Sequence, residues 1–107
     1  MTTTLTDFQK IVLKVGKIVE AVPHPNADRL LVLQVDLGTE RRQLVAGIRG
    51  AYAPEELVGR SVVVVANLEP ATIRGVESQG MVLAAKQGET LTVFVPDRVI
   101  PPGADIH

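Results

Sequence analysis

The stretch of sequence that decides the fold is Leu31-Val32-Leu33-Gln34-Val35-Asp36-Leu37-Gly38-Thr39-Glu40-Arg41-Arg42-Gln43-Leu44-Val45-Ala46. Its first half places an apolar residue at every second position from Leu31 to Leu37, which puts these residues on one face of a strand. Gly38-Thr39-Glu40 is a turn signal, and a third strand of the chain follows from about Arg42 to Ala46. Residues 31–46 therefore predict a β-hairpin.

Working outward, the flanking segments also predict short strands, at residues 11–22, 61–66, 79–85 and 91–95. Gly16 is a candidate bulge or bend in the first of them. Helical turns are expected at residues 6–10, with Thr6 as N-cap, at 26–30, and from Pro54, while 67–75 is expected to be a loop. Many short strands separated by Gly and Pro predict a small all-β barrel, and this pattern alone fits an OB-type or an SH3-like barrel.

The composition limits the classes of protein to which the chain can belong. Its 107 residues fit one domain, which we place at 7–107 after a flexible N-terminus at 1–6. There is no cysteine, and the net charge of −1 excludes a protein that coats nucleic acid by bulk positive charge. The longest purely apolar run, 62–66, is far too short for a membrane helix, and the N-terminus does not resemble a secretory signal, so we expect a cytoplasmic location.

The sequence offers little for catalysis. His24 and His107 are the only histidines, Ser61 and Ser78 are the only serines, and no phosphate-binding loop motif is present. His24 and Asp28 are four residues apart, but Pro25 prevents a regular helix between them, so His24 and Pro25 are expected to shape a turn. We therefore expect a protein that is not an enzyme and that holds neither metal nor cofactor.

A binding function is better supported, by the segment 66–81. It carries hydrogen-bonding groups suited to phosphates and base edges on Asn67, Arg74, Ser78 and Gln79, and Met81 offers a soft thioether. An alternative is structural: glycines that permit turns, Asn67 capping a strand end and Met81 filling the core. The chain has only three aromatic residues, which argues against binding single strands by base stacking.

Several motifs together resemble the structure-independent tRNA-binding domain family. They are Val15-Gly16-Lys17-Ile18, His24-Pro25-Asn26-Ala27-Asp28-Arg29-Leu30, Val35-Asp36-Leu37-Gly38, Val45-Ala46-Gly47-Ile48, Pro54-Glu55-Glu56-Leu57-Val58-Gly59, Ala66-Asn67-Leu68 and Gly75-Val76-Glu77-Ser78-Gln79-Gly80-Met81. The family includes the C-terminal domain of bacterial methionyl-tRNA synthetases and free-standing tRNA-binding proteins. The resemblance implies a five-stranded OB-fold barrel that binds tRNA by shape. It also implies a homodimer, built with Phe8 and residues 93–106, that assists an aminoacyl-tRNA synthetase.

The resemblance also implies which residues contact RNA: Lys17, Arg29, Asn67, Arg74, Ser78, Gln79 and Met81. It predicts that Arg29→Ala and Ser78→Ala each weaken tRNA binding without affecting fold or dimer. One departure is Glu69, where family members usually carry lysine. A carboxylate in place of a cation reduces attraction to phosphate, so we expect weak binding that is strongly sensitive to salt.

A second class of protein shares this fold. Secretion chaperones of the CsaA type are similar in fold and dimer but bind extended polypeptide. They lack the Ser-Gln-Gly-Met sequence that this chain carries at Ser78-Gln79-Gly80-Met81, so the resemblance favours a tRNA-binding function.

Overall fold

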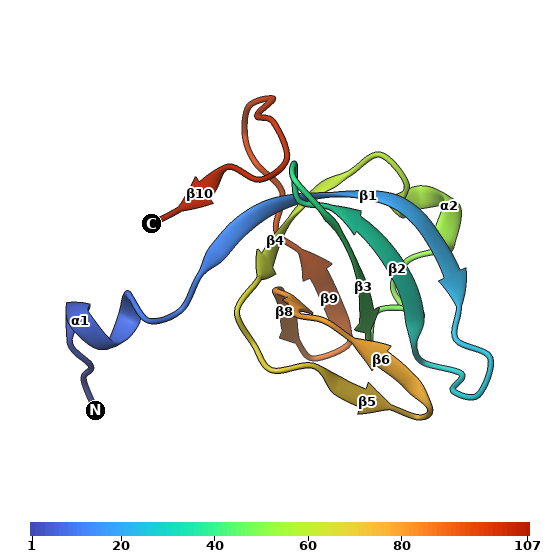
Figure 1. Cartoon of the computed structure of the whole chain (residues 1–107). Coiled ribbons are helices and arrows are strands. Elements are labelled where there is room, and N and C mark those ends of the chain that lie inside the picture. Colours follow the sequence, from blue (N-terminus) through green and yellow to red (C-terminus); the bar gives the residue numbers. More distant parts are fainter.

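An antiparallel sheet of six strands forms the body of the structure, a computed structural model that describes residues 1–107 (Figure 1). The long strand β1 (Leu13–Pro23) pairs with β2 (Leu31–Asp36), β4 (Ser61–Val65) and the short C-terminal β10 (Asp105–Ile106). The sheet continues from β2 to β3 (Arg41–Ala46) and from β4 to β7 (Met81–Val82). The pairing of Leu31 with Ala46 and of Asp36 with Arg41 confirms the predicted hairpin.

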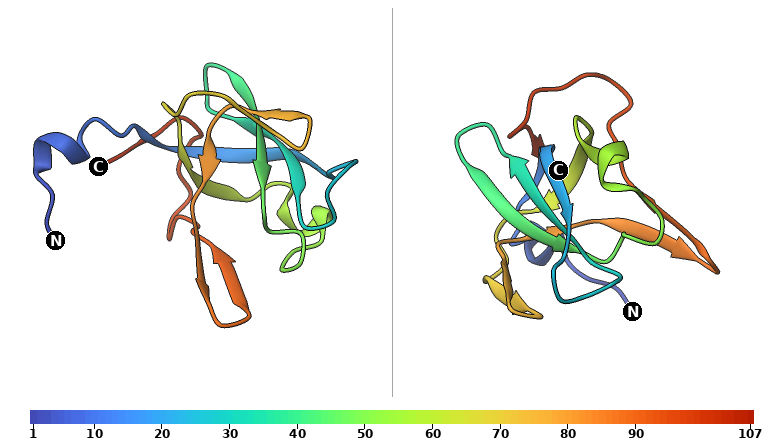
Figure 2. Two further views of the ribbon diagram at one scale, coloured as in Figure 1. Left: turned by 90° about the horizontal axis from the view of Figure 1, so that it is seen from below. Right: turned by 90° about the vertical axis from the view of Figure 1, so that its right-hand side faces the viewer.

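Two hairpins and two short helices complete the chain. Strands β5 (Ala71–Ile73) and β6 (Val76–Ser78) form one hairpin, and β8 (Ala84–Gln87) and β9 (Thr90–Val93) form the other, which projects from the barrel (Figure 2). Helix α2 (Pro54–Leu57) lies between β3 and β4, whereas α1 (Leu5–Phe8) lies away from the barrel, near the C-terminus (Figure 1). No helix of the chain is long and apolar enough to cross a bilayer.

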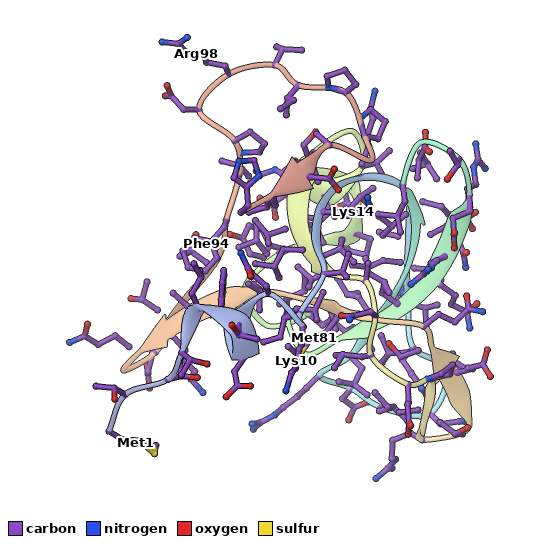
Figure 3. The ribbon with its side chains drawn as sticks, turned by 60° about the vertical axis from the view of Figure 1, so that its left-hand side comes forward. Met1, Lys10, Lys14, Met81, Phe94 and Arg98 are labelled. Carbon is purple, nitrogen blue, oxygen red and sulfur yellow. The ribbon has the colours of Figure 1, made fainter.

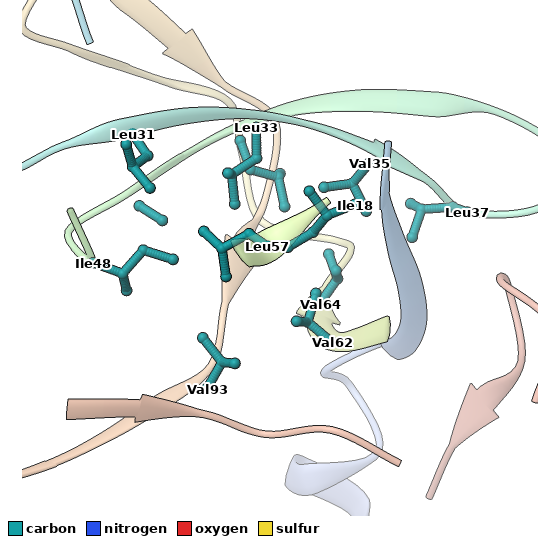
Figure 4. Close-up of a cluster of buried hydrophobic side chains, with 12 residues drawn as sticks. Ile18, Leu31, Leu33, Val35, Leu37, Ile48, Leu57, Val62, Val64 and Val93 are labelled. Atoms are coloured by element: carbon teal, nitrogen blue, oxygen red, sulfur yellow. The ribbon is translucent and has the colours of Figure 1, made fainter. Parts of the chain in front are cut away.

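The core lies inside the curved sheet (Figure 4). Every second residue from Leu31 to Leu37 is buried, as the alternation predicts, and these side chains pack on Ile18 and Leu57. From the fourth strand, Val62 and Val64 point into the same cluster. One face of each of the strands β1, β2, β3 and β4 thus supplies most of the apolar interior.

One backbone hydrogen bond and several side-chain hydrogen bonds, rather than a regular ladder, close the barrel between β3 and residues 77–80. The Gln79 N–H donates to the carbonyl of Gln43 (2.8 Å), and the Gln43 N–H donates back to the Gln79 side-chain oxygen (3.1 Å). The Val45 N–H donates to the Ser78 hydroxyl (3.0 Å). The result is the nearly closed five-stranded barrel that the resemblance implied, with strands in the OB-type arrangement.

Gly16 differs from the prediction. The register shift in β1 lies between Ile18 and Glu20, so the bulge is not at Gly16. Gly16 instead lies in the core, where an added Cβ would come within 2.5 Å of a Val35 methyl and 2.9 Å of a Val64 methyl. Glycine is required here because a larger side chain would clash with the core, and no local sequence pattern reveals this requirement.

Four other local predictions are corrected. The N-terminal helix is capped by Thr4, whose hydroxyl accepts from the Asp7 N–H, and not by Thr6. Residues 26–30 form turns without a helix, because Pro25 and the contacts of His24 fix their backbone. The expected loop at 67–75 contains strand β5 of the first hairpin. The strand expected at 79–85 is divided between β7 and β8 at Leu83.

Candidate nucleic-acid interface

Two loops far apart in the sequence meet at one end of the barrel. The 24–30 loop joins β1 to β2, and the 66–80 segment joins β4 to β7 and contains the β5–β6 hairpin. These are the loops between the first and second and between the fourth and fifth strands of the barrel. In OB folds that pair of loops, with the face of strands 2 and 3, forms the surface that binds oligonucleotides.

His24 holds the two loops together. Its ring is only 3% exposed, and its Nδ1 accepts a hydrogen bond from the Asn26 N–H (2.9 Å). The proton therefore resides on Nε2, which donates to the carbonyl of Ile73 on the hairpin (3.0 Å). Both ring nitrogens are thus used within the chain, which agrees with the expectation that His24 shapes a turn.

Arg74 forms a second contact between the loops, from the tip of the hairpin. Its φ of 52° is the only positive value outside glycine, and Gly75 follows with a φ of 90°. A two-residue hairpin turn with both φ values positive favours Asn or Gly at its first position, and a longer L side chain there costs roughly 1 kcal/mol. The guanidinium donates to the Asn26 carbonyl (3.2 Å) and remains exposed, so that a strained residue presents a cation beside the 24–30 loop.

Arg29 lies at the other end of the 24–30 loop. It is exposed, and its carbonyl accepts from the Arg49 N–H (3.4 Å). Its side chain lines a hollow of about 410 Å³ together with Lys86 and Glu89 of the β8–β9 hairpin. None of the chain's three ion pairs involves these residues, so the charge of Arg29 is available to a ligand.

Three of the predicted residues are engaged in holding the fold. Ser78 is buried, and its hydroxyl accepts from Val45 and donates to the Gly80 carbonyl (2.9 Å), so it has no group to offer a ligand. The half-buried Gln79 closes the barrel with Gln43. The Asn67 amide accepts from the Val12 N–H (2.8 Å) and donates to the Lys10 carbonyl (2.6 Å), which fixes the N-terminal segment to the end of β4.

Met81 and Lys17 lie in different places. Met81 is 44% exposed and lines an apolar groove of about 430 Å³ between the two hairpins. Lys17 is exposed on β1 and lines a hollow with residues 59–61 and the 95–102 segment, which lies on the opposite side of the barrel from the β5–β6 hairpin (Figure 1). The structure therefore gathers Arg29, Arg74 and Met81 around the two loops and separates Lys17 from them.

Arg42 is a structural residue that no sequence motif marks. It donates hydrogen bonds to the carbonyls of Ala66 and Gln79 and pairs with Glu40 at 2.5 Å. The hydrogen bond and charge of Arg42 hold the pKa of Glu40 below its usual value. Arg42 shares a hollow with two carboxylates, those of Glu40 and Glu69. Phosphate attraction is therefore weak at this point, and Arg42 serves the closure of the barrel. A position within a predicted strand does not indicate that the Arg42 side chain closes the barrel, because its partners Ala66 and Gln79 are distant in the sequence.

The fold brings together no group of three or more histidine and carboxylate side chains that could hold a metal ion. The exposed polar groups around the two loops are suited instead to hydrogen bonds and to the charges of a phosphate backbone.

The sequence pattern described as "Putative tRNA binding domain" matches residues 13–105, nearly the whole barrel with its two loops. The chain belongs to this tRNA-binding domain family. The matched span covers β1, both loops and the first residue of β10, and every predicted contact residue lies within it.

Curated relatives of the tRNA-binding domain are found within much longer proteins. The chain is 58% identical over 101 residues to methionine–tRNA ligase of Thermococcus kodakarensis and 55% identical over 103 residues to that of Thermotoga maritima. These alignments cover 94% and 96% of this chain but only 14% and 16% of the ligases. The chain thus spans about a seventh of the length of these relatives.

Solved structures of the chain's own size are also similar. A MetRS-related protein from Pyrococcus horikoshii superposes with a TM-score of 0.94 at 33% identity, covering 100% of this chain and 99% of that one. The chaperone CsaA from Bacillus anthracis superposes with a TM-score of 0.91 at 27% identity, with full coverage of both chains. The barrel of the tRNA-binding domain is therefore shared with a chaperone.

Proposed function

We propose that this chain binds tRNA through the two joined loops, recognises its shape rather than its sequence, and assists an aminoacyl-tRNA synthetase without catalysing a reaction itself. The observation that carries the proposal is the family match over residues 13–105, which includes both loops at the end of the barrel. The high identity to a segment of methionine–tRNA ligases supports methionyl-tRNA synthetase as the enzyme served. We propose that the chain acts in the cytoplasm.

We propose contacts to tRNA for those predicted residues whose side chains are exposed beside the two loops. Arg29 and Arg74 present free charge for phosphates, and Met81 presents apolar surface. Ser78, Gln79 and Asn67 position the loops from within, and Lys17 adds attraction from a separate face. The few exposed cations beside the two loops and the carboxylate of Glu69 favour weak, salt-sensitive binding.

We further propose a homodimer, because α1 needs a partner to cover it. This helix of four residues buries none of its side chains, with Leu5 70% and Phe8 41% exposed. So short a helix is not stable by itself. Further exposed apolar residues follow β9 at Phe94, Val95, Val99 and Ile100. A second copy that covered both segments would also present two RNA surfaces, which strengthens weak binding.

Titration of labelled bulk tRNA with the wild-type chain and with Arg29→Ala tests the proposal. We expect wild type to bind at low salt and Arg29→Ala to bind several-fold more weakly. Arg41→Ala is the matched control, because it removes the same charge from an exposed residue opposite Asp36, at the end of the β2–β3 hairpin that lies away from the 24–30 loop. Equal affinities of the three proteins would remove the 24–30 loop from the site, and failure of wild type to bind would refute tRNA binding.

A second candidate function is that of a polypeptide-binding chaperone. The full-length superposition on CsaA and the apolar groove beside Met81 favour it. The family match and the identities above 50% to methionine–tRNA ligases favour tRNA. An unfolded polypeptide that binds the chain and displaces tRNA would select the chaperone.

A further inference from the structure

The β8–β9 hairpin lies outside the five-stranded barrel, yet it lines two adjoining hollows beside the proposed RNA surface. The first is the cationic hollow, lined by Arg29, Lys86 and Glu89. The second is the apolar groove, whose lining includes Leu68, Ile73, Met81, Ala84 and Leu91, with the carboxylate of Glu69 as its one charged group. Gly47 and Leu91 line both, so the groove and the cationic hollow adjoin.

The chain's hollows differ in charge and in surroundings. The hollow at Arg42 holds one cation and two carboxylates and does not favour an anion. The hollow at Lys17 holds three cations, Lys17, Arg60 and Arg98, against Asp97, but exposed apolar residues of the proposed dimer surface line it. The cationic hollow holds two cations against one carboxylate, and it alone has an arginine of the 24–30 loop.

The chemistry of the two adjoining hollows is that of one nucleotide. A phosphate needs unpaired cations, and neither Arg29 nor Lys86 is paired in the chain. An unstacked base needs apolar contact, and the groove's volume of about 430 Å³ lies within the range of sites that hold small molecules. A polarisable thioether, that of Met81, lines the groove.

We propose that the β8–β9 hairpin is part of the RNA site: Lys86 and Arg29 bind a backbone phosphate, and the apolar groove between the hairpins holds the unstacked base of the neighbouring nucleotide. This inference rests on the proposed tRNA binding and assigns a subsite within it. An extended polypeptide is the competing occupant of the groove.

Lys86→Ala tests the phosphate. The side chain is exposed, so the fold does not depend on it. We expect several-fold weaker tRNA binding at low salt, and a slope of log K against log salt that is smaller by about 0.7–0.9 for one lost contact. Glu89→Gln removes the opposing carboxylate and is expected to strengthen binding. Arg41→Ala, the control for charge, is expected to leave the slope unchanged.

A pair of matched variants tests the base. Ala84 lines the groove, while its neighbour Ala85 lies on the other face of β8, and both are exposed. Ala84→Glu is expected to weaken tRNA binding several-fold by blocking the groove. Ala85→Glu adds the same charge without blocking it and is expected to have a clearly smaller effect.

Short single-stranded RNA and inorganic polyphosphate, used as competitors against labelled tRNA, separate base from phosphate. We expect the RNA to displace tRNA from wild type better than polyphosphate at equal phosphate concentration, and Ala84→Glu to abolish that advantage.

Three results would overturn the subsite while tRNA binding itself stands: an unchanged affinity and slope for Lys86→Ala, equal losses for Ala84→Glu and Ala85→Glu, or equal displacement by the two competitors. If wild type binds no tRNA but binds unfolded polypeptide, and Ala84→Glu abolishes that binding, the groove is a peptide site. The proposed function then fails as well.

Discussion

At the scale of single residues, the structure uses polar side chains in two distinct ways. Ser78 and His24 are buried with every hydrogen-bonding group satisfied inside the chain. Arg29 and Arg74 lie nearby on the surface with their charge free of ion pairs. Mutations at the two kinds of position should therefore separate stability from binding.

Ser78→Ala is expected to destabilise the fold, which revises the expectation that it affects binding alone. It leaves the Val45 N–H without its acceptor, and such a loss costs about 1–3 kcal/mol. Urea unfolding monitored by circular dichroism measures this cost. A variant as stable as wild type that binds tRNA more weakly would instead place Ser78 in direct contact with RNA.

Gly16→Ala is expected to lower the free energy of unfolding by about 1–3 kcal/mol. The new methyl would meet two buried valines of the facing strands, at 2.5 and 2.9 Å, which cannot both move away. Gly50→Ala is the control, because no atom lies within 4 Å of the added Cβ. Similar urea midpoints for the two variants would contradict the packing described here.

The Lys14–Asp105 pair predicts a pH dependence for the attachment of the C-terminus (Figure 3). The hydrogen bond and charge of Lys14, 2.7 Å from the carboxylate, lower the pKa of Asp105 below its usual value of 3.8. The pair therefore favours β10–β1 pairing above pH 3.8, and this contribution is lost as the pH falls through the lowered pKa.

A carbon-13 titration of the Asp105 carboxyl checks this pair. Lys14→Met is expected to return the pKa of Asp105 towards 3.8, whereas Lys17→Met, which removes an unpaired lysine from the same strand, should leave it in place. An unchanged pKa in Lys14→Met would show that the pair does not form in solution.

At the scale of elements, the candidate site depends on the hydrogen bonds that hold the 24–30 loop and the β5–β6 hairpin together. The β5–β6 hairpin is held against the 24–30 loop by His24 and by the Arg74–Asn26 hydrogen bond. The hairpin's own ladder is three residue pairs long, which is too little to be stable without that support. His24 thus holds the 24–30 loop and the β5–β6 hairpin in a fixed arrangement.

His24→Ala is expected to release the hairpin. The change leaves the Asn26 N–H and the Ile73 carbonyl unpaired, so amide exchange at residues 71–78 should become faster while exchange in β2 stays slow. tRNA binding should weaken in parallel, because Arg74 loses its fixed position. His107→Ala is the control at the exposed C-terminus. Unchanged exchange in the hairpin would show that His24 does not position it.

The elements with regular apolar alternation could be predicted from the sequence, and those fixed by distant contacts could not. Residues 31–46 carry their own pattern and turn, and the predicted hairpin is confirmed. The β5–β6 hairpin has three-residue strands and an arginine at a turn position that favours Asn or Gly, so no local signal marks it. Likewise, the roles of Ser78 and Asn67 depend on partners 33 and 55 residues away.

At the scale of the whole molecule, both chain ends leave apolar side chains without partners. Helix α1 and the 94–102 segment lie outside the barrel, and together they expose the apolar residues from which we propose a dimer (Figure 1). The proposed RNA surface is formed by other segments, the 24–30 loop and the β5–β6 and β8–β9 hairpins.

The double variant Phe8→Asp/Phe94→Asp is expected to be a monomer in sedimentation velocity, whereas wild type sediments as a dimer. Each carboxylate would have to be buried without a partner in the dimer, which costs several kcal/mol. Val58→Asp, at an equally exposed apolar position beside α2, should remain dimeric. A monomeric wild type would contradict the proposed dimer.

The central claim is that the barrel's two joined loops bind tRNA. The most direct test is a fluorescence anisotropy titration of labelled bulk tRNA with wild-type protein at low and high salt, repeated with excess unfolded polypeptide. We predict binding that weakens steeply with salt and is not displaced by the polypeptide. Failure to bind tRNA at the lowest salt, or displacement of the tRNA by the polypeptide, would contradict the claim.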